Sequence, residues 1–166
     1  MVSEKYRDAH SAPLSTDPVT RKEILALSDL FLELCSSKPG LVEGARELVD
    51  YLHSCNYRLH ICSNGFHEVQ YKKLRACGMA EDFNTVILSE DAGANKPSVM
   101  FFEYALLKTG ARRENTLMIG DNYNTDILGA KNTGLDAAFF NRFPDFPPPG
   151  PVDYVVTSLM QLKEIL

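Results

Sequence analysis

The sequence lacks the features that usually mark membrane, secreted and nucleic-acid-binding proteins. It has no run of about 18 apolar residues and no basic segment followed by an apolar one near its start, so we expect neither a membrane span nor a secretory leader. It also lacks an excess of positive charge. The 17 Lys and Arg against 22 Asp and Glu give a net charge of −5, which argues against nucleic acid or an anionic membrane as the main partner.

The sequence also contains no closely paired cysteine motif. Its four cysteines include no Cys-x-x-Cys, which is typical of free thiols in a reducing compartment, so we expect a cytoplasmic protein. One cluster, formed by His53, Cys55, His60 and Cys62, suggests zinc. Its spacing matches no common zinc module, and its two halves fall on different predicted elements, so we expect no zinc site there.

What the sequence does contain is an ordinary globular composition with alternating helix and strand patterns. At 166 residues, 45% hydrophobic and 23% charged, it is long enough for one domain with its own core. Helical signals mark residues 18–35 (capped by Asp17), 42–54, 66–77, 98–108 and 125–132, and apolar runs mark strands at 57–62, 85–89, 116–119 and 136–140. This alternation predicts an α/β fold with a Rossmann-like, doubly wound, mainly parallel sheet. The segment 142–151 holds five of the nine prolines and is expected to be a surface spacer loop.

The most informative segment is the predicted strand 116–119 together with the residues that follow it. The strand runs into Gly120-Asp121, and a second carboxylate, Asp126, stands at the start of a helix-like segment. Ligands in open α/β sheets bind beyond the carboxyl ends of the strands, and two carboxylates there make an oxygen-rich site suited to Mg²⁺. The alternative is that Asp121 is a turn residue and Asp126 a helix N-cap, because Asp favours both places.

Two other predicted strand ends carry groups that suit a phosphate. Ser63-Asn64-Gly65 follows the strand at 57–62 and offers a hydroxyl and free backbone N–H groups. Lys96-Pro97 follows the strand at 85–89, which would place the Lys96 ammonium at the rim of the sheet. Each of these alone is compatible with a turn hydroxyl or a solvated lysine. In this order, together with Asp121 and Asp126, they favour a phosphate site.

These motifs resemble those of the haloacid dehalogenase (HAD) superfamily, specifically its Mg²⁺-dependent phosphohydrolases. The resemblance covers about residues 38–166. The matching segments are Ile61 to Phe66 for the family's second motif, Lys96-Pro97 for the third, Gly120-Asp121 with Asp126 for the fourth, and 152–159 for the usual last strand and helix. Residues 63–79 and 89–97 look most like the pyrimidine 5'-nucleotidase-like branch.

The resemblance also identifies what is missing. The family's nucleophile is the first Asp of an Asp-x-Asp-x-Thr motif at the end of an N-terminal strand, and this sequence contains no Asp-x-Asp. The Asp residues before the second motif, Asp8, Asp17, Asp29 and Asp50, follow no strand-like run. We therefore expect a C-terminal piece of a larger enzyme. Residues 1–37 would be the remnant of a helical cap, and residues 38–166 the α/β core without its first strand.

The mechanism implied by the resemblance is hydrolysis of small phosphate esters through an aspartyl-phosphate. Asp121 would bind Mg²⁺ directly, and Asp126 would act on the metal through water or by orienting its shell. The turn of Ser63, Asn64 and Gly65 would hold phosphate oxygens, while Lys96 would neutralise charge. Lys96 and Asp126 are thus the expected catalytic side chains. This chain alone is expected to be inactive and to bind Mg²⁺ weakly, because the nucleophile's carboxylate is missing.

Two other functions remain open at this stage. The chain could be a non-catalytic binding protein that keeps the HAD fold, or a fragment with no function of its own. The partner expected from the resemblance is a small phosphorylated metabolite, with nucleoside monophosphates suggested by the nucleotidase-like segments. Loss of a central strand would also leave two unpaired sheet edges. We expect one of three outcomes: the two edges close onto each other, another chain fills the gap through self-association, or the protein is only marginally stable.

Overall fold

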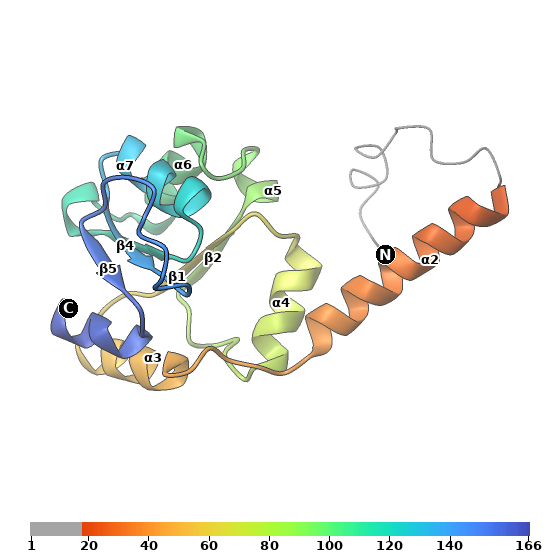
Figure 1. The fold of residues 1–166 in the computed structure, drawn as a ribbon, viewed down its shortest axis with the longest axis horizontal. Helices are drawn as coiled ribbons and strands as arrows, with labels where there is room; N and C mark the ends of the chain where they lie inside the picture. The colour runs from red at the N-terminus through yellow and green to blue at the C-terminus, as the bar shows by residue number, and fades with distance from the viewer. Residues whose placement is uncertain (1–17) are drawn as a thin grey trace.

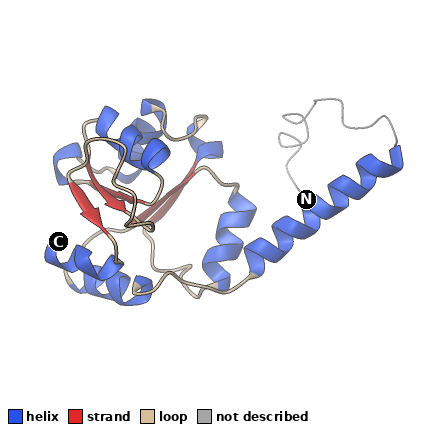
Figure 2. Cartoon of the chain, in the orientation of Figure 1, coloured by secondary structure: helices blue, strands red, loops and turns tan. Residues whose placement is uncertain are grey.

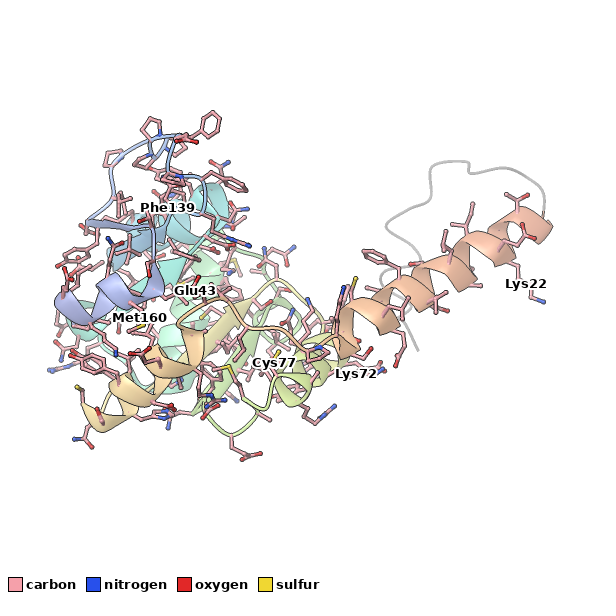
Figure 3. All side chains as sticks on the ribbon, turned by 60° about the horizontal axis from the view of Figure 1, so that its bottom comes forward. Lys22, Glu43, Lys72, Cys77, Phe139 and Met160 are labelled. Atoms are coloured by element: carbon pink, nitrogen blue, oxygen red, sulfur yellow. The ribbon has the colours of Figure 1, made fainter. Side chains whose placement is uncertain are left out.

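The structure is a computed structural model that describes residues 18–166, and the expected cap at Asp17 and the Asp at position 8 lie outside this range. The first helix, α2 (Pro18–Ser37), projects from the α/β body, as Figure 1 shows. It lies beside α4 (His67–Ala76), and an ion pair between Glu33 and Lys72 joins the two helices. In Figure 3, Lys72 lies where α2 meets the body, whereas Lys22 lies at the far end of the helix.

The helix α2 carries large apolar side chains that are open to solvent. They recur at helical spacing and are 40–67% exposed: Ile24, Leu27, Leu30, Phe31 and Leu34. A stripe of this kind is the usual buried face of an amphipathic helix. Within the described residues nothing covers it, which agrees with the expectation that residues 1–37 belong to a larger helical unit. That domain assignment stays a prediction.

The five strands of residues 18–166 form two separate parallel sheets. One contains β1 (His60–Ser63) and β2 (Thr85–Leu88), and the other contains β3 (Leu117–Gly120), β4 (Asp136–Phe140) and β5 (Tyr154–Val156). Figure 2 shows the strands at the centre of the body with helices around them. The predicted α/β fold with a parallel sheet is therefore confirmed. No hydrogen-bonded ladder joins β1 to β3, so the first of the expected outcomes, closure of the two edges, does not occur in residues 18–166.

Helices cover both faces of the strands, because successive side chains of a strand point to opposite faces. Cys62, Met118, Ala137 and Phe139 pack on one face with α6 (Val99–Thr109) and α7 (Leu128–Asn132). Leu117, Ile119, Ala138 and Phe140 pack on the other face, where α3 (Ala45–Ser54) and the 3₁₀ segment η3 (Leu159–Glu164) lie side by side. This is the doubly wound arrangement that the alternating pattern predicted.

Element boundaries differ from the predictions where local geometry intervenes. The helix expected from residue 42 begins at Ala45, because Gly44 takes a left-handed conformation with φ of 77°. The helix expected over 98–108 uses Ser98 as its N-cap, whose side chain accepts from Met100 N. The short helix α5 (Ser89–Ala92) and the 3₁₀ segment η1 (Arg113–Asn115) were not predicted from the sequence. No helix among residues 18–166 is long and apolar enough to cross a membrane.

Candidate active site

Lys96 lies at the centre of the candidate site. Its ammonium donates to the carbonyl oxygen of Cys62, 2.8 Å away, and to Oδ1 of Asp126, 2.7 Å away. The Lys96 and Asp126 side chains are only 9% and 8% exposed. Because charge-assisted hydrogen bonds are strongest where water is excluded, this pair fixes the loop after β2 against the end of β1 and the turn after β3.

The Asn64 side chain holds the backbone of Lys96. Its Nδ2 donates to the Lys96 carbonyl oxygen over 3.1 Å, and its Oδ1 accepts from the Lys96 N–H over 2.8 Å. Both hydrogen-bonding ends of the amide are therefore used to position Lys96. The sequence placed Asn64 at the site as a backbone phosphate donor, and the structure adds this side-chain role, which its turn position did not indicate.

Asp126 lies in a π-helical turn, η2 (Tyr123–Ile127), instead of at the start of an α-helix. Its Oδ2 accepts from the Asn122 N–H over 3.2 Å, and its Oδ1 accepts from the Thr125 hydroxyl over 3.1 Å as well as from Lys96. The N-cap is Asn122, whose side chain accepts from Thr125 N, so the alternative reading of Asp126 as the cap is wrong. A single π turn of this kind is frequent at functional sites.

Gly120 is required by the position of Asp126. A Cβ atom at residue 120 would lie 2.4 Å from the Asp126 Cβ and 2.5 Å from its Oδ2. The close approach of this carboxylate to the strand end thus depends on a residue without a side chain. Gly120 and Asp126 form one packed unit.

Asp121 is the accessible carboxylate of the site. Its side chain is 53% exposed, and its charged neighbour is Arg142, whose NH1 lies 3.5 Å from Asp121 Oδ2. Asp126, by contrast, already accepts three hydrogen bonds. The two carboxylates therefore differ in availability: Asp121 can take an incoming cation, whereas Asp126 is committed to Lys96.

The turn after β1 places the Ser63 hydroxyl at the same edge. Ser63 Oγ accepts from the Gly65 N–H over 3.0 Å, which leaves the hydroxyl proton available for an acceptor such as a phosphate oxygen. A Cβ atom at Gly65 would lie 2.1 Å from Gln70 Nε2, so an added side chain would require the flexible Gln70 side chain to move.

Cys62, whose carbonyl oxygen accepts from Lys96, carries a thiol that is poorly suited to attack. The pKa of its thiol is raised to about 11, mainly by burial, which outweighs the lowering by the Lys96 charge and is reinforced by the Asp126 charge. Thiolates, not thiols, are the reactive form, so Cys62 is unreactive near neutral pH. Within residues 18–166, no group of three or more His, Cys, Asp or Glu is arranged to hold a metal ion, and the expectation of no zinc site stays a prediction.

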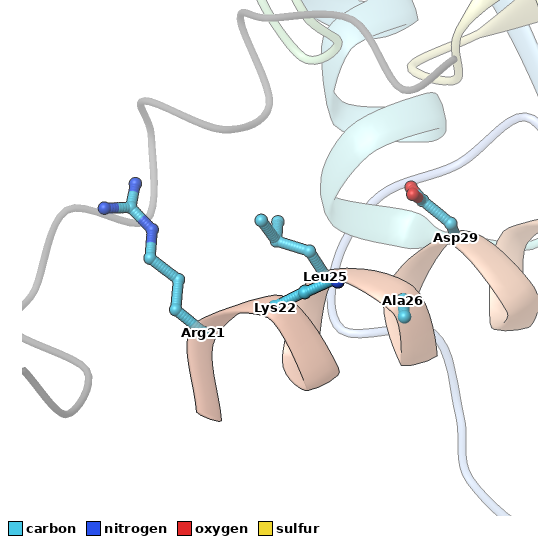
Figure 4. A pocket seen from close by; sticks show the side chains of 5 residues that line it. All are labelled: Arg21, Lys22, Leu25, Ala26 and Asp29. Carbon is cyan, nitrogen blue, oxygen red and sulfur yellow. The ribbon is translucent and has the colours of Figure 1, made fainter. Parts of the chain in front are cut away.

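A cavity of about 610 Å³ opens beside these strand ends, between α2 and the starts of α4 and α5. Phe66 and His67, which follow the Ser63–Gly65 turn, line it together with Glu90 and Asp91, which follow β2. His67 is fixed there: its N–H donates to Glu90 and its Nε2 lies 2.8 Å from Asp91 Oδ1. A second hollow, shown in Figure 4, lies along α2 alone and contains none of the site residues.

The fold and the site together define an α/β protein with a lysine, a buried carboxylate and an accessible carboxylate at the carboxyl ends of parallel strands. The comparisons with known proteins agree. Residues 21–140 match the family described as haloacid dehalogenase-like hydrolase, and the chain belongs to that family. The family resemblance drawn from the sequence is therefore confirmed.

Similar proteins include several phosphatases. The chain is 38% identical to a glyceraldehyde 3-phosphate phosphatase of Methanothermobacter thermautotrophicus over 72% of this chain and 55% of that protein. It is 32% identical to the pyrimidine 5'-nucleotidase YjjG of Escherichia coli over 85% of this chain and 61% of that protein. The magnesium-bound structure of the putative HAD-hydrolase YfnB of Bacillus subtilis matches with a TM-score of 0.78 and 31% identity, covering 86% of this chain and 62% of YfnB. The chain thus spans between half and two thirds of each of these proteins.

Proposed function

We propose that this chain is the C-terminal part of a phosphohydrolase of small phosphate esters, whose nucleophilic aspartate lies outside these 166 residues. The observation that carries the proposal is the buried Lys96–Asp126 pair, hydrogen-bonded to the end of β1 and adjoining the accessible Asp121. Lysine and carboxylates at one sheet edge suit the transfer of a phosphoryl group, which depends on positioning and charge neutralisation more than on other chemistry. The phosphatase relatives support the same reaction class.

Each site residue then has a distinct task. The Ser63 hydroxyl and the Asn64 N–H hold phosphate oxygens, whereas the Gly65 N–H donates to Ser63 Oγ and so positions the hydroxyl. Lys96 supplies a fixed positive charge, and Asp126, with three hydrogen bonds of its own, orients Lys96. Asn64 holds the backbone that carries the lysine.

The donor set fits Mg²⁺ as part of a site. Asp121 offers one half-exposed carboxylate, and Mg²⁺ in phosphate-handling sites is commonly held by one or two carboxylates, water and the substrate's own oxygens. When bound, the ion would supply a compact positive charge that stabilises the phosphoryl group. With one accessible carboxylate the affinity is expected to be low.

The covalent step needs an attacking carboxylate, and none of the residues 18–166 given a role above is proposed to supply it. Asp126 is committed to Lys96, Asp121 to a cation, and Cys62 is protonated near neutral pH. The attacking aspartate is therefore assigned to a segment that would lie between β1 and β3, where the described strands leave the two sheets unjoined. The chain by itself is proposed to be inactive.

The substrate class follows from the relatives. Nucleoside monophosphates are proposed first, because the nucleotidase YjjG matches 85% of the chain, and small sugar phosphates second. The cavity bordered by Phe66 and His67 is the proposed place for the leaving group, since it opens directly after the Ser63–Gly65 turn.

The test compares two lengths of the protein. The chain of 166 residues, with Mg²⁺ and p-nitrophenyl phosphate, should show no turnover, because loss of a covalent nucleophile removes many orders of magnitude of rate. The reading frame extended upstream of Met1 should contain a strand ending in Asp-x-Asp-x-Thr, and its product should hydrolyse phosphate esters in a reaction lost in Asp121→Ala.

Two results would overturn this proposal. Metal-dependent turnover by the short chain, abolished in Asp121→Ala, would mean that the nucleophile lies within it. An extended reading frame without the motif, giving an inactive product that still binds phosphate, would favour a non-catalytic binding protein with the HAD fold.

A further inference from the structure

Arg142 contacts the candidate site. It lies in the segment 142–151, which was predicted from the sequence to be a spacer loop. Its NH1 lies 3.5 Å from Oδ2 of Asp121, and the two side chains are 56% and 53% exposed. Arg142 lies two residues after the end of β4, so a fourth strand end contributes a charged group to the candidate site. Arg142 belongs to none of the family motifs and has no role in the proposed function.

The start of this loop is held in place by Asn141, which is only 6% exposed. The Asn141 N–H donates to the Val156 carbonyl oxygen, and its Nδ2 donates to the Phe146 carbonyl oxygen, both over 2.8 Å. Its Oδ1 accepts from the Phe143 N–H over 3.1 Å. Three hydrogen bonds from one buried residue fix the backbone on both sides of Arg142.

The end of the loop is attached to the turn that carries Asp126. The Tyr123 hydroxyl, at the first position of η2, donates to the Pro151 carbonyl oxygen over 3.1 Å. Gly150 packs against the same hydroxyl, since a Cβ there would lie 2.5 Å from it. The Tyr123 ring stands edge-on to Phe139 of β4, with centroids 5.9 Å apart. The loop is thus anchored at both ends beside the candidate site.

We propose that Arg142 is a positioning residue of the cation site, and that its guanidinium is the internal counter-ion which an incoming divalent cation displaces from Asp121. The inference rests on the proposed function in that Asp121 is taken as the cation ligand. A guanidinium and a metal ion both need the carboxylate oxygens, so the two compete. The other charged pair facing this edge, Lys96 with Asp126, is already satisfied and leaves Asp121 as the contested group.

The expected size of the effect follows from the exposure of the pair. Ion pairs between solvent-exposed side chains are weak, so loss of the Arg142 charge should improve cation affinity by about two- to fivefold. Because exposed charges are screened by salt, the gain should shrink as ionic strength rises.

The experiment is a titration of the ¹⁵N-labelled full chain with Mg²⁺ at low ionic strength, following the backbone amides of Asp121 and Asn122 by NMR. Arg142→Gln should lower the Kd about two- to fivefold, and Arg142→Lys, which keeps the charge, should stay near the wild-type value. The matched control is Arg112→Gln, which removes a similarly exposed arginine 3.8 Å from Glu114 and should leave the Kd unchanged. Asp121→Asn should abolish the shifts.

An unchanged or weaker Kd in Arg142→Gln would overturn the proposal, as would an equal gain in Arg112→Gln. Absence of any Mg²⁺-dependent shift at Asp121 in Arg142→Gln would overturn it as well, and the spectrum itself reports whether each variant is folded. The readout involves no substrate and no turnover, so its failure leaves the phosphohydrolase proposal standing. Conversely, an inactive extended protein would leave the cation competition intact.

Discussion

Lys96 and Asp126 lie 30 positions apart in the sequence, yet their charged atoms are 2.7 Å apart and nearly inaccessible to solvent. Through its second hydrogen bond, to the Cys62 carbonyl oxygen, Lys96 also links the strand pair β1–β2 to the turn after β3. This pair therefore has a structural role, in joining the two sheets, as well as its proposed catalytic one.

Removal of one partner of the Lys96–Asp126 pair should strongly lower the stability of the folded protein. We expect Lys96→Met to lower the free energy of unfolding by about 3–5 kcal/mol, because it leaves the Asp126 carboxylate buried without its cation. Urea unfolding measures the loss. Lys163→Met is the matched control, since its partner Glu47 is exposed and the pair should contribute only about 0–1 kcal/mol. The double variant Lys96→Met/Asp126→Asn should lose less than Lys96→Met alone, and equal losses in the two single lysine variants would contradict the expectation.

Gly120→Ala should damage the site without removing any of its charges. The added methyl group would lie 2.4 Å from the Asp126 Cβ, so the carboxylate must move, and we expect a loss of about 1–3 kcal/mol. Gly40→Ala is the control, because a Cβ there meets nothing within 4 Å. Thermal unfolding compares the two variants. A Gly120→Ala protein as stable as Gly40→Ala would show that the Gly120–Asp126 contact is not tight.

The buried Cys62 thiol should make the free energy of unfolding depend on pH. Its folded pKa of about 11 lies above the ordinary value near 9, so burial favours the protonated thiol. The stabilisation is fully present below about pH 9 and is lost as the pH rises to about 11, which amounts to roughly 3 kcal/mol at 1.4 kcal/mol per pH unit. Urea unfolding at pH 8.5 and pH 11, with Cys62→Ala for reference, isolates this term. Equal pH dependence in both proteins would refute it.

The facing edges of β1 and β3 should exchange their amide hydrogens faster than the outer strands. Every residue of β1 and of β3 is only half-buried, whereas Ile87 and Leu88 of β2 and Ala137 and Ala138 of β4 are at most 1% exposed. This reverses the usual pattern of a doubly wound sheet, whose central strands are buried on both faces. Hydrogen exchange measured by NMR tests the expectation, and uniform protection across the strands would contradict it.

The unpaired edges of β1 and β3 should also affect self-association of the protein. Unpaired strands are templates for pairing with other chains, so we expect the isolated protein to self-associate with increasing concentration. Sedimentation velocity over a range of concentrations provides the measurement. A monomer at every concentration that also melts cooperatively would show that the open edges are tolerated.

Much of the fold could be predicted because its signals are local. The strand predicted at 136–140 has those bounds as β4, and the strand predicted at 85–89 differs from β2 by one residue. Short apolar runs between turn residues carry such information within themselves. The family motifs likewise singled out Ser63, Lys96, Asp121 and Asp126, which lie at or after strand ends in the structure, although their roles stay predictions.

What the sequence by itself determined was the order of strands and helices, the α/β class and the residue types at each strand end. Only the tertiary structure decided which of those residues contact one another. Asp126 pairs with Lys96 and packs against Gly120, and the Asn64 side chain holds the backbone of Lys96. Asp121 lies beside Arg142. The π turn at 123–127 belongs to the same group, since its Asp126 carboxylate accepts from Lys96, 30 positions away in the chain, as well as from the nearby Asn122 and Thr125. Hydrophobic periodicity reports burial along one element, whereas hydrogen bonds and ion pairs between strand ends depend on which ends meet in space.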